Sequence, residues 1–150
     1  MARLWVGKDE DADKEGGVWS SFSTRQMLLL CVGAMTIEQM RKTATGIRNT
    51  CITKTGLVEG MKTGQYPEDH DLQCYAQCVM KTIRTFKNQK VDVDMVIKQI
   101  EMMMPIEWQE DMKAAARKCG ALESSDDICV TAFNYVKCNY HENPDNFFFP

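Results

Sequence analysis

The seven cysteines of this 150-residue chain constrain its fold more than any other feature. In a cytosolic protein, so many thiols would suggest a metal site, whereas in a secreted protein they would pair as disulfides. Whether the chain is secreted therefore determines whether its cysteines are expected to form disulfides or to bind a metal.

The N-terminal segment favours secretion. Residues 1–26 are polar, rich in acidic side chains and without a helical or strand period, which is typical of a disordered leader, an upstream translation product or an expression remnant. Residues 27–34 form a short apolar run that follows Arg25 and contains the small residues Val32 and Ala34, as in the hydrophobic part and cleavage site of a signal peptide. Because this run is far too short to cross a bilayer, we expect no membrane span there.

Cleavage after Ala34 would remove Cys31 and leave six cysteines in a domain of residues 35–150. An even number in a small secreted domain predicts a disulfide framework. The six are Cys51, Cys74, Cys78, Cys119, Cys129 and Cys138. Six cysteines allow fifteen pairings, and their spacing alone does not choose among them.

The same domain predicts an all-α fold. Apolar residues recur every three or four positions, and we expect six helices in the segments 37–47, 53–61, 72–86, 93–104, 107–118 and 128–136. Polar residues that can cap helices precede these segments: Thr36, Asp69 or Asp71, Asp92, and Ser124 or Ser125. Residues 87–90 are interpreted as a polar loop, and no segment alternates as a strand would.

The C-terminal tail, residues 139–150, ends in three phenylalanines and a proline. Leaving each phenylalanine in water costs roughly 1.5–3 kcal/mol, so we expect the tail to dock onto the domain. It would then be either a surface lid over core residues or a plug that forms part of a ligand cavity, and the composition leaves both interpretations open.

The cysteine spacing and two sequence segments are those of a known family. Three residues separate the second and third cysteines of the domain, and eight separate the last two. With the segments Met35–Met40 and Asp71–Val79, residues 35–150 resemble the six-cysteine PBP/GOBP family of insect odorant-binding proteins. The tail is similar to that of a member that binds alcohols and pheromones.

This resemblance implies a compact bundle of about six helices around an apolar cavity, with the pairs Cys51–Cys78, Cys74–Cys129 and Cys119–Cys138. It also implies a secreted carrier, in a fluid such as sensillum lymph, that binds small hydrophobic odorants, pheromones, or long-chain alcohols or esters. An olfactory receptor and a second copy of the chain are the macromolecular partners that it suggests. It implies no cofactor.

The resemblance also proposes ligand-binding residues. Carried over onto this sequence, they are Met80, Ile83, Thr85, Val91, Ile100, Met103, Phe133, Phe148 and Phe149. Trp108 and Met112 join them because they lie on the apolar face of their expected helix. The Thr85 hydroxyl would bind the polar group of the ligand, or it would bond back to its own helix. Methionine suits a pocket that accepts several shapes, although core filling is the simpler interpretation of any single one.

Two other functions compete with a carrier. The pair His70–Asp71, just before Cys74, is similar to the active-site pair of secreted phospholipases A2, but the glycine-rich calcium loop and the adjacent cysteines of those enzymes are missing. We therefore expect no catalytic residues and no metal site. A secreted helical interaction or defence protein is the second alternative. Nucleic acid is not an expected partner, because the net charge is -3 and no basic stripe occurs.

His141 lies in the tail segment and generates a first testable prediction. Its protonation in acid would loosen a docked tail and release the ligand. In His141→Ala, ligand affinity measured from about pH 7.5 to about pH 5 should therefore change less than in the unaltered protein. An unchanged pH profile would contradict this role.

Overall fold

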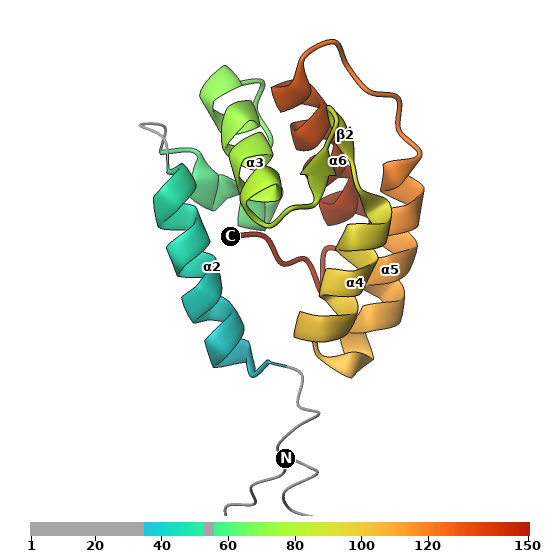
Figure 1. The fold of residues 1–150 in the computed structure, drawn as a ribbon. Coiled ribbons are helices and arrows are strands. Elements are labelled where there is room, and N and C mark those ends of the chain that lie inside the picture. Colours follow the sequence, from blue (N-terminus) through green and yellow to red (C-terminus); the bar gives the residue numbers. More distant parts are fainter. Residues whose placement is uncertain (1–34, 53–55) are drawn as a thin grey trace, which may run out of the picture. The chain divides into compact units, whose positions relative to one another are not determined.

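Helices account for most of the described part of the chain, which comprises residues 35–52 and 56–150 of a computed structural model. The expected leader and signal peptide at 1–34, and residues 53–55 at the start of the second expected helix, lie outside the described residues. The elements are α2 (Ile37–Cys51), the 3-10 helix η1 (Val58–Thr63), α3 (His70–Thr82), β1 (Phe86–Lys87), β2 (Lys90–Val91), α4 (Val93–Met103), α5 (Ile106–Gly120) and α6 (Ile128–Glu142) (Figure 1). The expected helical bundle of about six helices is confirmed.

Side-chain caps explain where most of these helices begin. At α2, the Thr36 hydroxyl accepts the backbone N–H of Gln39, and the Gln39 side chain accepts the N–H of Thr36, a reciprocal capping box. Asp69 and Asp92 accept backbone N–H groups in the first turns of α3 and α4. These three capping residues were expected from the sequence.

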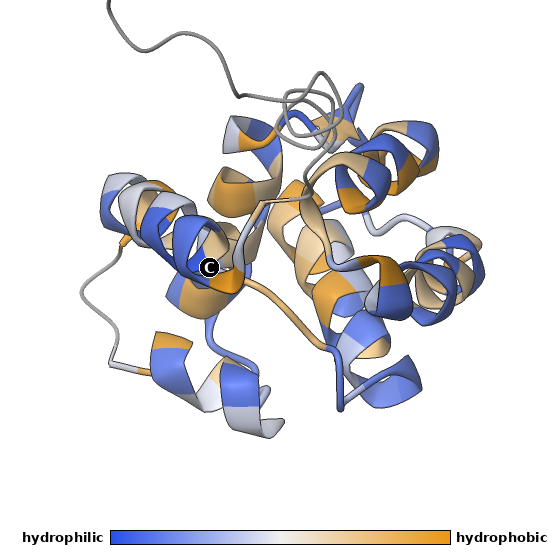
Figure 2. Ribbon diagram, turned by 90° about the horizontal axis from the view of Figure 1, so that it is seen from below, coloured by the Kyte–Doolittle hydropathy of each residue, from blue (hydrophilic) through white to orange (hydrophobic). Residues whose placement is uncertain are grey.

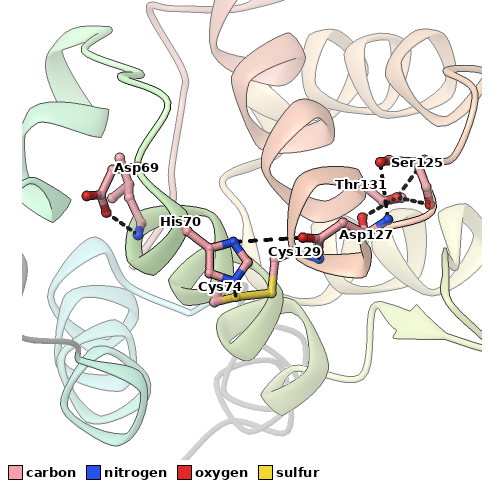
Figure 3. Close-up of polar contacts among 8 residues, drawn as sticks. Asp69, His70, Cys74, Ser125, Asp127, Cys129 and Thr131 are labelled. Carbon is pink, nitrogen blue, oxygen red and sulfur yellow. Dashed lines mark hydrogen bonds and ion pairs between the residues drawn. A yellow bond between two sulfur atoms is a disulfide. The ribbon is translucent and has the colours of Figure 1, made fainter.

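The expected cap of the last helix at Ser124 or Ser125 is wrong. Asp127 precedes α6, and its carboxylate accepts the backbone N–H of Cys129 at 2.7 Å. The Ser125 backbone instead exchanges hydrogen bonds with the Thr131 hydroxyl, as Figure 3 shows beside the Cys74–Cys129 disulfide. An aspartate suits this place because its negative charge also faces the positive end of the helix dipole.

The expected loop at 87–90 is a short β-hairpin, which corrects the expectation of no sheet. Strands β1 and β2 pair antiparallel with Phe86 opposite Val91. Asn88 and Gln89 between them have positive φ values of 51° and 62°. Two consecutive left-handed residues make the turn that best matches the twist of a two-stranded ribbon.

Helix α3 ends at Thr82, earlier than the apolar period suggested. Arg84 is left-handed with φ 61°, and its N–H donates to the carbonyl of Lys81. The N–H of Thr85 donates to the carbonyl of Met80 at 2.8 Å, which completes a Schellman motif. The chain therefore turns before Thr85, and this residue lies just past the helix rather than on it.

Three disulfides tie the helices together in the expected pairs. Cys51–Cys78 joins α2 to α3, Cys74–Cys129 joins α3 to α6, and Cys119–Cys138 joins α5 to α6. Helices α3 and α6 also pack most extensively against each other, and α4 packs against α5. No helix among the described residues is long and apolar enough to cross a membrane.

Gly120, the last residue of α5, allows a close approach between α5 and the start of α4. A Cβ atom built on Gly120 would collide with Cγ2 of Val93, a side chain with few alternative rotamers. We expect Gly120→Ala to lower the free energy of unfolding by about 1–3 kcal/mol, measured by urea denaturation. Gly46→Ala in α2 is the matched control, because nothing lies within 4 Å of its Cβ position, and it should raise stability by about 0.5–1 kcal/mol. Equal effects of the two substitutions would contradict the close packing.

Candidate functional site

An apolar cavity of about 140 Å³ lies among the helices and the C-terminal tail. Residues of α2, α4, α5 and α6, the end of α3 and the tail line it. Its lining includes six methionines: Met35, Met40, Met80, Met103, Met104 and Met112. Flexible, polarizable side chains of this kind let a cavity adapt to ligands of different shapes.

The tail is part of the cavity wall. Helix α6 continues to Glu142, so the non-helical tail is 143–150, and its last four residues, 147–150, all line the cavity. In Figure 1 the dark red tail crosses from the end of α6 towards α3 and α2, and Figure 2 shows it as an orange segment between the helices. Of the two arrangements left open by the sequence, this is the one in which the tail helps to form the cavity.

A buried hydroxyl holds the end of the tail. Tyr75 is fully buried on α3, and its hydroxyl donates a hydrogen bond to the main-chain oxygen of Pro150 at 2.7 Å. Burial raises the pKa of Tyr75 to about 12, so this group keeps its proton and remains a donor at neutral pH. The ring of Phe149 meets Tyr75 edge-on, with centroids 6.3 Å apart. The docking of the tail therefore combines ring contacts with one hydrogen bond.

Most of the residues expected to bind ligand lie along this cavity. Eight of the eleven line it: Met80, Ile83, Thr85, Ile100, Met103, Met112, Phe148 and Phe149. Val91 on β2 and Trp108 on α5 do not line the cavity but pack against the core clusters that contain part of its lining, and Phe133 is buried against the ring of Tyr66. Ligand contact by any of the eleven stays a prediction.

Sequence reasoning missed several lining residues on α2, α4 and α6. On α2, Met40, Ala44 and Ile47 share one helical face, so the apolar period could have placed them together. On α6, Tyr135, Asn139 and Asn143 line the cavity at intervals of four residues. No sequence signal marked these polar side chains, because their face matters only once the tail has folded back beside it.

The side chains that line the cavity are uncharged. No Asp, Glu, Lys or Arg of the described chain lines the cavity, and no group of acidic, histidine or cysteine side chains among those residues could hold a metal ion. The Thr85 hydroxyl, only 2% exposed, donates to the carbonyl of Met80 at 3.1 Å. The Gln99 amide donates to the carbonyl of Ile83 and so links α4 to the end of α3. Such a space favours neutral, largely apolar molecules.

His70, from the pair that is similar to the active-site pair of secreted phospholipases A2, does not line this cavity. His70 is exposed at the start of α3, where its Nδ1 is 3.8 Å from the Asp127 carboxylate and its Nε2 is 3.6 Å from Sγ of Cys74 (Figure 3). These contacts join the beginnings of α3 and α6 beside the Cys74–Cys129 disulfide, so the position of His70 is explained by a structural role.

A helical bundle tied by three disulfides around a methionine-lined cavity without charged side chains is typical of the class of small carriers of hydrophobic ligands. Comparison with known proteins places the chain in a family of such carriers. The PBP/GOBP family matches residues 33–142, and the chain belongs to this family. Its family and fold support a hydrophobic ligand carrier, since odorant-binding proteins are carriers and not enzymes.

Individual relatives match along most of their length. Odorant binding protein 5 of Apis mellifera is 43% identical in sequence with a TM-score of 0.73, over 79% of this chain and all of that one. Odorant binding protein 4 of Chrysopa pallens is 30% identical with a TM-score of 0.69, over 77% and 99% of the two chains. General odorant-binding protein 72 of Anopheles gambiae is 28% identical over 122 residues, which are 78% of this chain and all of the relative.

The hydrogen bond from Tyr75 to the tail predicts a measurable contribution to stability. Tyr75→Phe keeps the buried ring but leaves the main-chain oxygen of Pro150 without this donor, so the free energy of unfolding should fall by about 1 kcal/mol, and proteolysis of the tail should accelerate. Tyr66→Phe is the matched control, because the Tyr66 hydroxyl is buried without a hydrogen-bond partner among the described residues. Tyr66→Phe should leave stability unchanged or raise it. A similar loss in both variants would show that the tail hydrogen bond contributes nothing specific.

Proposed function

We propose that this protein is a secreted carrier that binds small hydrophobic odorants or pheromones in its internal cavity and delivers them to chemosensory receptors. The observation that carries the proposal is the methionine-lined cavity, which has no charged side chains in its lining and is walled in part by the tail. The signal-like run at 27–34 and the three disulfides support an extracellular location. Pairing with a second copy of the chain stays a prediction.

The size of the cavity bears on its ligands. An engineered protein cavity of about 150 Å³ binds benzene, so the 140 Å³ here suits a compact volatile molecule. Longer pheromones, alcohols or esters need more room. The six lining methionines and the tail are the parts whose rearrangement would supply it.

The hydroxyl of Thr85 can accept a hydrogen bond from a ligand in the cavity. Because its proton is already donated to the Met80 carbonyl, its oxygen can only accept a further hydrogen bond. An alcohol can donate that bond, whereas a carbonyl compound cannot. Thr85 is therefore our proposed contact for hydroxyl-bearing ligands.

The tail offers a route by which pH could act on binding. His141 is exposed near the end of α6, and its ring centroid lies 5.7 Å from that of Tyr140. Tyr140 in turn meets Phe147 of the tail at 5.2 Å. These ring contacts support the hypothesis that protonation of His141 loosens the tail.

Displacement of an apolar fluorescent dye tests the carrier function. We expect saturable dye binding that small odorants reverse. Ala44→Phe would place a ring in the cavity from α2 and should weaken dye binding at least about tenfold, which corresponds to about 1.4 kcal/mol. Thr45→Phe, on the same helix but exposed and outside the lining, should change nothing.

Absence of displaceable binding would instead favour the secreted interaction or defence protein, whose helices need a core but no ligand. Equal weakening by Ala44→Phe and Thr45→Phe would mean that the dye binds elsewhere.

A further inference from the structure

The hydroxyl of Tyr135 is an unpartnered polar group on a residue that lines the mostly apolar cavity. Tyr135 lies on α6, lines the cavity and is only 6% exposed. Its Oη atom is buried and has no hydrogen-bond partner among the residues that the structure describes. A buried hydroxyl without a partner costs about 1–3 kcal/mol, so such groups call for an explanation.

One polar side chain, that of Asn139, lies close to this hydroxyl, but the hydroxyl makes no hydrogen bond of normal geometry with the described residues. Asn139, one turn further along α6, donates its amide N–H to the backbone carbonyl of Tyr135 at 2.8 Å. The Asn139 side chain interacts with the phenol and lowers the pKa of Tyr135, but burial is the larger cause and raises that pKa to about 12. The phenol is therefore neutral at physiological pH and has a proton to donate.

A second spare donor lies two turns away on the same face. Asn143 also lines the cavity, and its Nδ2 atom is buried without a partner in the described part of the chain. Its Oδ1 atom accepts the backbone N–H of Asn146, which fixes the orientation of the amide. The NH₂ group of Asn143 is therefore available to donate to another partner. Tyr135 on α6 and Asn143 just after α6 thus offer hydrogen-bond donors, whereas Thr85, just past α3, offers only an acceptor.

We propose that the Tyr135 hydroxyl is the polar anchor of the cavity and donates a hydrogen bond to the carbonyl oxygen of a neutral aldehyde, ketone or ester. A carbonyl oxygen accepts but cannot donate, so it matches Tyr135 and cannot bond to Thr85. An ionised acid is a poor ligand, because the lining contains no positive charge to offset its desolvation. This proposal rests on the proposed function and adds the chemical class of the ligand.

Three ligands of similar size test it: cyclohexanone, cyclohexanol and methylcyclohexane, each used to displace the apolar dye. Tyr135→Phe removes only the hydroxyl, and the dissociation constant of cyclohexanone should rise about 3- to 10-fold. That of methylcyclohexane should stay constant or fall, because the variant no longer buries an unpaired hydroxyl. Equal shifts for ketone and hydrocarbon, or no shift for either, would overturn the proposal.

Tyr66→Phe is the matched control. The Tyr66 hydroxyl is also buried and unpartnered among the described residues, but Tyr66 does not line the cavity. Ketone affinity should therefore be unaffected, and a loss as large as that in Tyr135→Phe would contradict the assignment. If the unaltered protein bound neither dye nor ligands, the carrier function itself would fail, a result distinct from failure of the anchor.

A measurement on the unaltered protein avoids reliance on the folding of a variant. The infrared carbonyl stretch of bound cyclohexanone should lie at lower frequency than that of cyclohexanone in an alkane solvent, because the carbonyl accepts a hydrogen bond. A frequency equal to that in the alkane would overturn the proposal.

Discussion

The three disulfides are the constraint on which the rest of this structure depends. A cavity of 140 Å³ forfeits packing worth about 3 kcal/mol, at about 24 cal/mol per Å³. In the loop-entropy account, the Cys74–Cys129 bridge alone, with a sequence separation of 55, offsets this with about 4 kcal/mol. The bridges connect α2, α3, α5 and α6, so these helices stay together without a fully packed interior.

The C-terminal tail forms the part of the cavity wall that the disulfide-linked helices leave open. The helices leave an apolar space that the segment 147–150 helps to close, and Tyr75 holds the last residue through a buried hydrogen bond. The cavity wall is thus made partly of covalently restrained helices and partly of a segment held only by noncovalent contacts. The helices are therefore the covalently restrained part of the cavity wall, and the tail is the part that can move without breaking a covalent bond.

The sequence predicted the helices better than it predicted the details that shape the site. Regular apolar periods and strong caps such as Thr36 and Asp92 act locally, so they could be interpreted without a structure. The disulfide pairs came from a family resemblance, because spacing alone allows fifteen pairings. The hairpin at Asn88 and Gln89 was missed because neither residue is glycine, the usual signal of such a turn. Tyr135 was missed because only tertiary packing leaves its hydroxyl buried and free.

The central claim is that hydrophobic molecules bind inside this cavity, and the methionines allow a direct measurement. With ¹³C-labelled methionine methyl groups, a titration with cyclohexanone followed by NMR reports on sites throughout the domain. The account predicts saturable shifts of lining methyls such as Met80, Met103 and Met112, and none for the exposed Met102, which lies outside the lining. Shifts confined to Met102, or no saturable shift of the lining methyls, would contradict it.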